Sequence, residues 1–306
     1  MHIFKNPRWI DSRLLADLSL DEIPVSIFDE INRGLAALQT APPVVSVVIP
    51  VLNEEMTILR TLHSLAASKT RFPVEVIVVN NNSSDRTQEV LNRLNVKSVF
   101  QPKEGWGPAR QMGQEHASGK YVLMADADCF YPPTWIQRMT KELMKDGVTC
   151  VYGGYSFLGS RDKSRWKFSI YESLRYLVSE IRHIHRPWYN SVGMCMGYVR
   201  DLGLRVGFVD HKIRGEDGRM CYELAQLGKI VRVRSKEVVV WTVPRTFKKD
   251  RSLVLSILDR AVIEIARFRL YLQKQPVHNT HTSANFTHPS LRYFRKSALS
   301  SKDKSD

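Results

Sequence analysis

Two aspartates one residue apart, Asp126 and Asp128, are the residues whose types and spacing most directly indicate chemistry. They follow the apolar run 121–125, which is typical of a buried strand in a parallel sheet. Ligands of open α/β sheets bind beyond the carboxyl ends of the strands, where this pair is expected to lie. Two crowded carboxylates repel each other, and a bound cation would compensate them. From the spacing alone, a metal site and a solvated acidic turn are equally good interpretations.

The chain before this pair alternates between strand and helix patterns. Runs of β-branched residues predict buried strands, and amphipathic stretches between them predict helices. In chain order we expect strand 44–50, helix 53–68, strand 74–79, helix 86–94, strand 96–100, helix 108–117 and strand 121–125. Asn53 is the predicted cap of the first of these helices. Four such alternations predict a parallel sheet with right-handed crossovers.

The alternation loosens after Asp128, and a different set of elements is expected there. Residues 1–43 precede the first strand with helical spacing of leucine and isoleucine, which predicts an N-terminal helical extension. The second half predicts helix 134–145, strand 148–155, a long helix 164–186, a glycine-rich apolar segment 192–198, helix 216–228, a β hairpin or paired strand 229–243 and helix 251–273. Residues 276–306 have the composition of a flexible polar tail.

Composition restricts the function further. The 306 residues carry a formal charge of +14, which favours an anionic partner. Residues 241–306 contain 13 Lys and Arg against 5 Asp and Glu, so the charge is concentrated there and nucleic acid is not expected as a partner. The four cysteines lack metal-ligand spacing and predict reduced thiols in a cytoplasmic protein. No signal peptide and no apolar run of membrane-spanning length is expected.

Four polar motifs accompany the predicted strands: 47–54, 78–87, 107–121 and the pair at 126–128. In this order and spacing they resemble the motifs of family 2 glycosyltransferases, strongly over residues 44–130 and in scattered pieces to about residue 247. The resemblance implies a GT-A fold, an α/β architecture with a Rossmann-like, mostly parallel sheet flanked by helices. It also implies transfer of a sugar from a nucleotide-diphosphate sugar.

The resemblance implies roles for several residues at the donor side. Glu54 and Asn80 would hydrogen-bond the base and ribose, within motifs that also contain Pro50 and Asn82. Arg110, in the helix after the glycine loop, would pair with a phosphate. Without a ligand, Glu54 would be an acid in the first turn of a helix, Asn80 would belong to an ordinary turn, and Arg110 would be a surface arginine.

The acidic pair would hold the cation, with Asp128 the more direct ligand and Asp126 beside it. Oxygen ligands favour Mn²⁺ or Mg²⁺ held together with the donor diphosphate. Asp217 is the candidate general base, with Glu216 as the fallback, although both could simply be helix-capping acids. Gly193 belongs to the segment that would lie beneath the donor sugar, or else to a plain core strand.

The full hypothesis divides the chain by these roles. Residues 44–130 form the nucleotide-sugar-binding half, 131–250 the acceptor-binding half and 251–275 a C-terminal helix. Arg245 could approach the diphosphate. The processive QxxRW motif is absent, which favours transfer of a single sugar to an unknown glycan, lipid or small-molecule acceptor.

Several alternatives remain open. A polyprenyl-phosphate glycosyltransferase would share these motifs, and so would an inactive nucleotide-sugar-binding protein of the same fold. A sugar nucleotidyltransferase would need a glycine-rich basic loop after the first strand, which residues 50–54 lack. The basic helices 164–186 and 251–273 could contact an anionic membrane peripherally at its inner face, or could be ordinary helices that cover the core.

Overall fold

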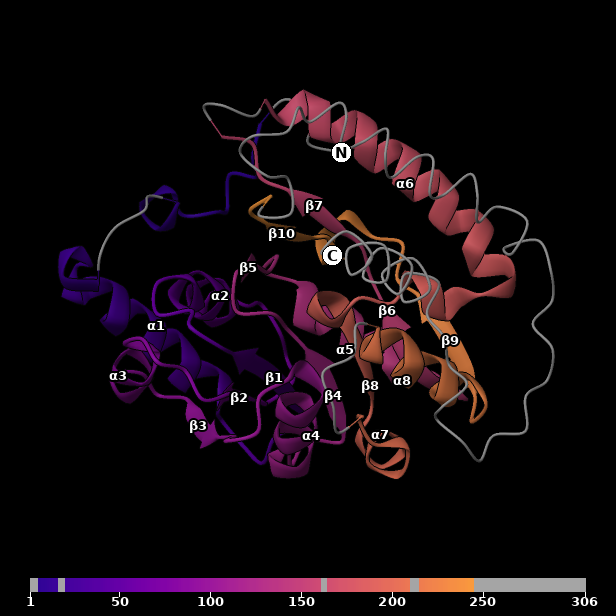
Figure 1. The fold of residues 1–306 in the computed structure, drawn as a ribbon, viewed down its shortest axis with the longest axis horizontal. Coiled ribbons are helices and arrows are strands. Elements are labelled where there is room, and N and C mark those ends of the chain that lie inside the picture. Colours follow the sequence, from indigo (N-terminus) through magenta and orange to yellow (C-terminus); the bar gives the residue numbers. More distant parts are fainter. Residues whose placement is uncertain (1–4, 16–19, 161–163, 210–214, 245–306) are drawn as a thin grey trace, which may run out of the picture.

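The computed structural model describes residues 5–15, 20–160, 164–209 and 215–244 (Figure 1). Its centre is a seven-stranded, mostly parallel sheet in the order β3-β2-β1-β4-β8-β6-β9. The strands are β1 Val45–Val51, β2 Val74–Asn80, β3 Lys97–Phe100, β4 Tyr121–Met124, β6 Val148–Tyr152, β8 Met196–Val199 and β9 Lys229–Arg232. The first four run parallel, whereas β8 is antiparallel to both of its neighbours. The predicted parallel sheet is confirmed.

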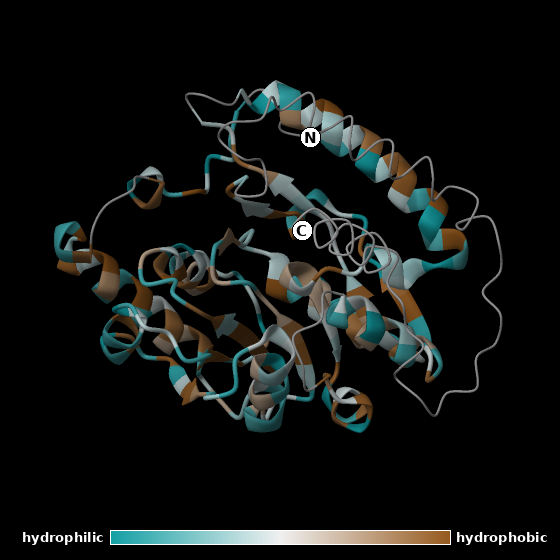
Figure 2. Cartoon of the chain, viewed as in Figure 1, coloured by the Kyte–Doolittle hydropathy of each residue, from teal (hydrophilic) through white to brown (hydrophobic). Residues whose placement is uncertain are grey.

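Helices cover both faces of this sheet because both faces of its strands are apolar. Along β1, Val47 and Ile49 contact one core and Val48 contacts the other, and β2 and β4 alternate in the same way. The first face packs against α1 Val25–Leu38, α2 Thr57–Ala66, α3 Thr87–Asn92 and α5 Trp135–Leu143. The second packs against α4 Trp106–His116, α7 Arg200–Val206 and α8 Glu216–Ala225. Figure 2 shows the hydrophobic residues gathered in the central strands.

The start of α2 differs from the prediction. Asn53 is not a helix cap: the helix begins at Thr57, and Asn53 adopts the left-handed backbone region with φ of 55°. Its side-chain oxygen instead accepts a hydrogen bond from the Ser84 amide at 2.8 Å. Asparagine tolerates this conformation better than most residues, and here it joins the loops that follow β1 and β2.

Two strand predictions in the second half hold only in part, because 229–243 contains paired strands, as one alternative expected, but not the hairpin. The strand expected over 148–155 is interrupted at Gly153 and Gly154, so that β7 Tyr155–Phe157 joins a separate sheet with β5 Cys129–Phe130 and β10 Val240–Thr242. The hairpin expected over 229–243 is also absent, because β9 pairs with β6 and β10 with β5 and β7. A short turn, Lys236–Val238, capped by Ser235, carries the chain from one sheet to the other.

The long helix predicted over 164–186 is α6 Arg165–His185, but its orientation is unexpected. It turns Arg165, Phe168 and Glu172 inward. Its regularly spaced apolar residues remain exposed at 45–61% of their surface: Trp166, Ile170, Leu174 and Leu177. The interpretation of this stripe as core-covering is therefore wrong. Among the described residues, no helix is both long and apolar enough to cross a membrane.

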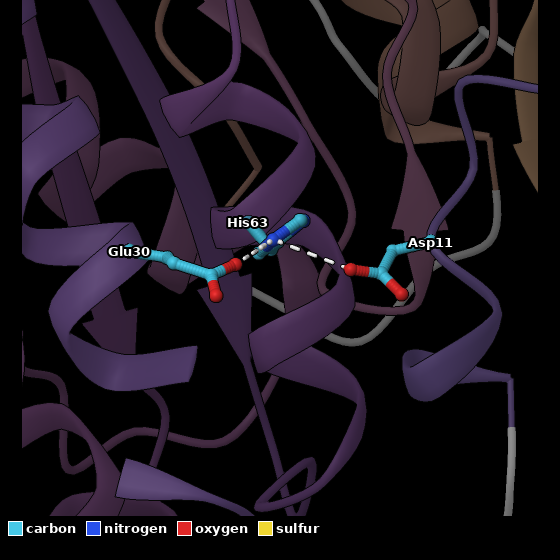
Figure 3. A group of neighbouring side chains, drawn as sticks. All are labelled: Asp11, Glu30 and His63. Atoms are coloured by element: carbon cyan, nitrogen blue, oxygen red, sulfur yellow. Dashed lines mark hydrogen bonds and ion pairs between the residues drawn. The ribbon is translucent and has the colours of Figure 1, made fainter. Parts of the chain in front are cut away.

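An ion-pair cluster ties Asp11 and Arg13 to helices α1 and α2. Asp11, Glu30 of α1 and His63 of α2 lie side by side (Figure 3). Arg13 donates to Asp11 at 2.6 Å and to Glu30 at 2.8 Å, and its guanidinium lowers the pKa of both carboxyl groups. Because Arg13 already compensates the two carboxylates, we assign this cluster to attachment of the N-terminal segment. The predicted helix 251–273 and tail 276–306 lie outside the described residues.

Candidate active site

The turn that carries Asp126 and Asp128 leaves the carboxyl end of β4 and is fixed from two sides. The Thr61 hydroxyl of α2 donates to the Asp126 carbonyl at 3.0 Å. The Tyr131 hydroxyl accepts from the Asp126 amide at 2.8 Å and donates to the Met194 carbonyl at 3.1 Å. These bonds fix the backbone of the acidic turn and join it to the loop around residue 194.

Arg110 brings three elements together at this edge. It lies in α4 and is almost completely buried. Its Nη1 donates to Glu216 at the start of α8, and its Nη2 lies 3.3 Å from Oδ1 of Asp126. Burial alone would lower the pKa of Arg110, but the charges of the two carboxylates outweigh it and raise that pKa. Arg110 therefore lies in the helix expected for it, at the same sheet edge as the acidic pair.

Asp217 is connected to the same network through the backbone. Its Oδ2 accepts from the Gly193 amide at 2.7 Å, and its Oδ1 accepts from the Gly218 amide at 2.8 Å. Gly193 begins a short turn, Gly193–Cys195, rather than the plain core strand that was one alternative for it. This turn lies directly on Arg110, because a Cβ added at Gly193 would be 1.9 Å from Arg110 Nη2.

Among the described residues, the charges at this edge do not balance. Asp126, Glu216 and Asp217 interact with the buried guanidinium of Arg110, and Asp128 and Asp217 add negative charge beside Asp126. Burial raises the pKa of Asp126 to about 6, against the opposing charge of Arg110, although 31% of its side chain is still exposed. Burial likewise raises the pKa of Glu216. The surplus of negative charge is the environment in which a cation is stabilising.

The residues present fit a divalent cation that is completed by a ligand. Asp126 and Asp128 supply oxygen donors, which Mg²⁺ and Mn²⁺ prefer. Among the described residues, three metal-type side chains converge within 4.8 Å at Asp11, Glu30 and His63, where Arg13 already occupies the carboxylates. The acidic turn offers no such third side chain. A cation there would take its remaining ligands from water and from a bound diphosphate.

The residues expected at the nucleotide side lie around the ends of β1 and β2. Pro50 is half-buried in β1, opposite Val79 of β2. Glu54 accepts from the Thr57 hydroxyl just before α2. Asn80 is buried at the end of β2, and Asn82 is exposed with φ of 61°. These positions share one edge of the sheet with the acidic turn.

Asn80 and its neighbour Asn81 are held by internal hydrogen bonds. The Asn80 amide group donates to Gln88 at 2.8 Å and its oxygen accepts from the Ser83 amide at 3.0 Å. Asn81 bonds both ends of the loop before α4, accepting from the Gly105 amide at 2.8 Å and donating to the Lys103 carbonyl at 2.7 Å. The role of Asn81 was not predicted, because three successive asparagines do not show which side chain will bond the loop before α4. Arg245 lies outside the described residues.

Comparison with known proteins assigns this arrangement to a family. The model of Glycosyl transferase family 2 matches residues 46–203, just over half of the chain. The chain belongs to glycosyltransferase family 2. The matched range contains Asp126, Asp128, Arg110 and Gly193, whereas Glu216 and Asp217 lie beyond it.

Curated relatives of this family 2 chain are distant and mostly longer. Chondroitin synthase of Escherichia coli is 28% identical over 55% of this chain and 26% of its own length. Glycosyltransferase AglE of Haloferax volcanii is 32% identical over 38% of this chain and 40% of its own length. An uncharacterised glycosyltransferase of Nostoc sp. is 27% identical over 61% of both chains. The chain thus spans less than two thirds of the length of these relatives.

Solved glycosyltransferases share the GT-A fold of this family 2 chain. Mannosyltransferase PcManGT from Pyrobaculum calidifontis, in complex with GDP-Man and Mn²⁺, superimposes with a TM-score of 0.52 at 17% identity over 82% of this chain and 76% of that one. S. aureus TarS 1-349, in complex with UDP-GlcNAc, gives 0.51 at 19% identity over 72% and 66%. The predicted GT-A fold is confirmed.

We expect Gly193→Ala to disrupt this family 2 site because the new methyl group would overlap the Arg110 guanidinium. The cost in the free energy of unfolding should be about 1–3 kcal/mol, typical of overpacking. Urea denaturation would measure it. Gly154→Ala is the matched control, since an added Cβ there meets nothing within 4 Å. Equal denaturation midpoints for the two variants would contradict the described contact.

We expect Asp126→Asn to stabilise the metal-free protein at neutral pH. The pKa of Asp126 rises from 3.8 in the unfolded chain to about 6 in the fold, so this group lowers stability progressively as the pH rises from 3.8 to 6 and by a constant amount above. Allowing for its partial exposure, the gain should be on the order of 1–2 kcal/mol, or a Tm increase of roughly 3–6 °C. Thermal denaturation at pH 7.5 and near pH 4 would measure it, and the gain should shrink at the lower pH. A lower Tm of the variant at pH 7.5 would contradict the assigned burial.

Proposed function

We propose that the protein transfers one sugar from a nucleotide-diphosphate sugar to an acceptor hydroxyl, with inversion at the anomeric carbon and dependence on Mn²⁺ or Mg²⁺. The observation that carries the proposal is the convergence of Asp126 and Asp128 with Asp217 around the buried Arg110. Two of the structural neighbours support it, since they are complexes with GDP-Man and Mn²⁺ and with UDP-GlcNAc. When bound, the cation would neutralise charge on the departing nucleoside diphosphate.

Each proposed role follows from where a side chain lies. Asp128 and Asp126 would hold the cation from the carboxyl end of β4. Asp217 would take the proton of the acceptor hydroxyl, while its two backbone hydrogen bonds keep its carboxylate oriented. Arg110 would pair with the donor phosphates. Its bonds to the carboxylates of Glu216 and Asp126 hold its guanidinium in a fixed position.

The nucleotide would lie over the ends of β1 and β2. Glu54 and Asn80 would contact its base and ribose, with Pro50 and Asn82 lining the same edge. Gly193 would lie beneath the donor sugar, where the absence of a side chain leaves room beside Arg110. Arg245 remains a candidate for the diphosphate. Glu216 is the alternative base, although its bond to Arg110 favours a positioning role.

The experiment is a donor screen. The purified protein is incubated with UDP- and GDP-linked sugars, with Mn²⁺, with Mg²⁺ or with a chelator, and release of the nucleoside diphosphate is measured. We expect release from one donor group that depends on the cation. Binding of nucleotide sugars without any turnover across acceptor panels would instead indicate the inactive binding protein of the same fold.

A lipid phosphate acceptor is the second candidate, and α6 favours it. A polyprenyl-phosphate glycosyltransferase works at a membrane surface, and the outward stripe of α6 exposes Trp166, Ile170, Leu174 and Leu177. Lys167 lies within the same helix and is also exposed. A helix with exposed apolar and basic side chains suits a peripheral contact with an anionic membrane. A cytoplasmic location at the inner face of the membrane is part of this proposal.

The membrane contact predicts a lipid-dependent effect of α6. We expect the wild type to sediment with vesicles containing anionic lipid. Leu174→Ser combined with Leu177→Ser should bind several-fold more weakly, because two exposed leucines that would enter the lipid are lost from the contact. Leu52→Ser is a control, since Leu52 is also exposed but lies in the loop after β1 rather than in α6. Sedimentation that is equal for all variants, or independent of anionic lipid, would contradict this contact.

A further inference from the structure

A cavity outside the carboxylate cluster lies between α6 and the strands β6, β7 and β9. Its volume is 580 Å³, which is the size of a small-molecule site. Six basic side chains line it: Arg165, Arg175, Arg182, Arg232, Arg234 and Lys236. In Figure 1, α6 crosses over this end of the molecule, from β7 toward β9. Another cavity in the described part of the chain, of 520 Å³, lies near the amino ends of β2 and β4, beside Val74 and Ser118.

The basic side chains of this cavity exceed the acids that could neutralise them. One carboxylate, Glu172, lines the cavity, and Arg165 binds it at 2.7 Å. Just outside, Glu180 lies 3.0 Å from both Arg232 and Arg234, and hydrogen bonding to Arg234 lowers the pKa of Glu180 to about 2. Within the described part of the chain, two carboxylates therefore lie in or beside a cavity that six basic side chains line. Such a surplus within a concave surface attracts an anion.

Two of the arginines stack on tyrosine rings and keep N–H donors that make no hydrogen bond within the described part of the chain. The Arg175 guanidinium stacks on the Tyr155 ring at 3.7 Å and donates through Nη2 to the Tyr155 carbonyl. Its Nη1 is buried and has no hydrogen-bond partner among the described residues. Arg232 stacks on Tyr176 at 4.6 Å, and its Nη1 lies near Glu180 without the geometry of a hydrogen bond. Stacked guanidinium groups with unused N–H donors are suited to a phosphate, because they can donate to several of its oxygens.

The cavity adjoins the candidate base. Val192 lines the cavity, and the next residue, Gly193, donates its amide to Asp217. Gly153 also lines the cavity and donates its amide to the Cys195 carbonyl at 2.9 Å, at the end of the same turn. A molecule bound in the cavity therefore lies against the wall that holds Asp217. Tyrosine and tryptophan rings, including Tyr155 and Trp241, supply apolar surface for the rest of that molecule.

We propose that this cavity binds the phosphate of a phosphorylated acceptor, so that a hydroxyl of the same molecule reaches Asp217. The inference rests on the proposed function and names the acceptor class for it. In the transfer, the acceptor oxygen forms the new bond to the anomeric carbon as the bond from that carbon to the diphosphate oxygen breaks. The nucleoside diphosphate keeps the electron pair, and the hydroxyl proton goes to Asp217. The acceptor phosphate stays intact and remains with Arg175 and Arg232.

Binding of phosphorylated probes by the full chain tests this assignment. Calorimetry would use glucose 6-phosphate and glucose as one pair of probes. Phosphatidylcholine vesicles that contain phosphatidylinositol 4-phosphate or phosphatidylinositol would form the second pair, because both of these lipids carry the free hydroxyls that the transfer needs. We expect one phosphorylated probe to bind, its unphosphorylated partner not to bind, and Arg175→Gln to weaken that binding about 10–100-fold, as for loss of a charged hydrogen bond. The probe that responds identifies the acceptor as soluble or lipid-linked.

Arg93→Gln is the matched control, because Arg93 stacks on Phe28 at 3.6 Å on an exposed surface outside the cavity. Arg234→Gln is a second test variant whose half-exposed side chain makes misfolding a poor explanation for lost binding. Equal binding by the wild type and both cavity variants, or no binding of either phosphorylated probe, would overturn the inference. Nucleotide binding with Mn²⁺ is measured in parallel. If nucleotides bind and phosphorylated probes do not, this inference fails alone, whereas the reverse result removes the proposed function and leaves the anion site.

Discussion

Asp128→Asn is expected to lower cation-dependent sugar transfer about a thousandfold while leaving the fold intact. Asp128 lies at the carboxyl end of β4, in a turn whose backbone forms hydrogen bonds with the hydroxyl groups of Thr61 and Tyr131. Its replacement removes a charged oxygen ligand and leaves these backbone bonds in place, and the carboxamide oxygen can still accept from the Cys129 thiol. Stabilisation of the leaving group by a cation amounts to several kcal/mol, and about 4 kcal/mol corresponds to a thousandfold change in rate.

Steady-state release of nucleoside diphosphate at saturating Mn²⁺ would measure the effect of Asp128→Asn, with circular dichroism to verify the fold. Asp201→Asn is the matched control, because Asp201 is an exposed aspartate of α7 whose described ionic contact is with Arg200. Full Mn²⁺-dependent activity in Asp128→Asn would show that the acidic turn does not hold the cation.

Asp217→Asn is expected to lower transfer by about 10²–10⁴-fold while preserving binding of the nucleotide and the cation. The carboxylate accepts from the Gly193 and Gly218 amides, and an asparagine can keep one of these hydrogen bonds through its oxygen. The variant therefore retains most of the local geometry but has no group that accepts the acceptor proton.

Parallel measurements of kcat and of nucleotide affinity would separate a lost base from a displaced loop. Loss of kcat alone assigns Asp217 to proton transfer, whereas loss of both indicates that it only positions Gly193. Glu223→Gln, in the same helix α8, is the control. If Asp217→Asn keeps its activity and Glu216→Gln loses it, the base is Glu216, and the described Arg110–Glu216 bond must open during the reaction.

The strands that hold the site could be predicted because their signals are local. The β-branched runs of β1 and β2 and the apolar run before Asp126 are buried on both faces, as their composition required. The helix that carries Arg110 could also be predicted, since α4 follows a glycine loop and precedes β4. Because β1, β2 and β4 run parallel, their carboxyl ends lie at the same edge of the sheet.

The features that could not be predicted depend on partners far away in the chain. The β9 and β10 segments resemble the two halves of a hairpin, but each pairs with strands more than 70 residues earlier. The apolar stripe of α6 is a regular amphipathic pattern, yet the Arg165–Glu172 ion pair and Phe168 occupy the inward face instead. Which of three asparagines fixes the loop before α4 was likewise decided by contacts with Gly105 and Lys103.

Calorimetric titration of a nucleoside diphosphate, UDP or GDP, into the wild type and Asp128→Asn, with and without Mn²⁺, tests the central claim most directly. We expect one nucleotide to bind the wild type tightly only when Mn²⁺ is present, and Asp128→Asn to lose this dependence. We also expect protons to be released as the cation binds near pH 6, because the cation must displace a proton from Asp126, whose pKa is raised to about 6. Nucleotide binding that is unaffected by both Mn²⁺ and the loss of Asp128 would contradict the central claim.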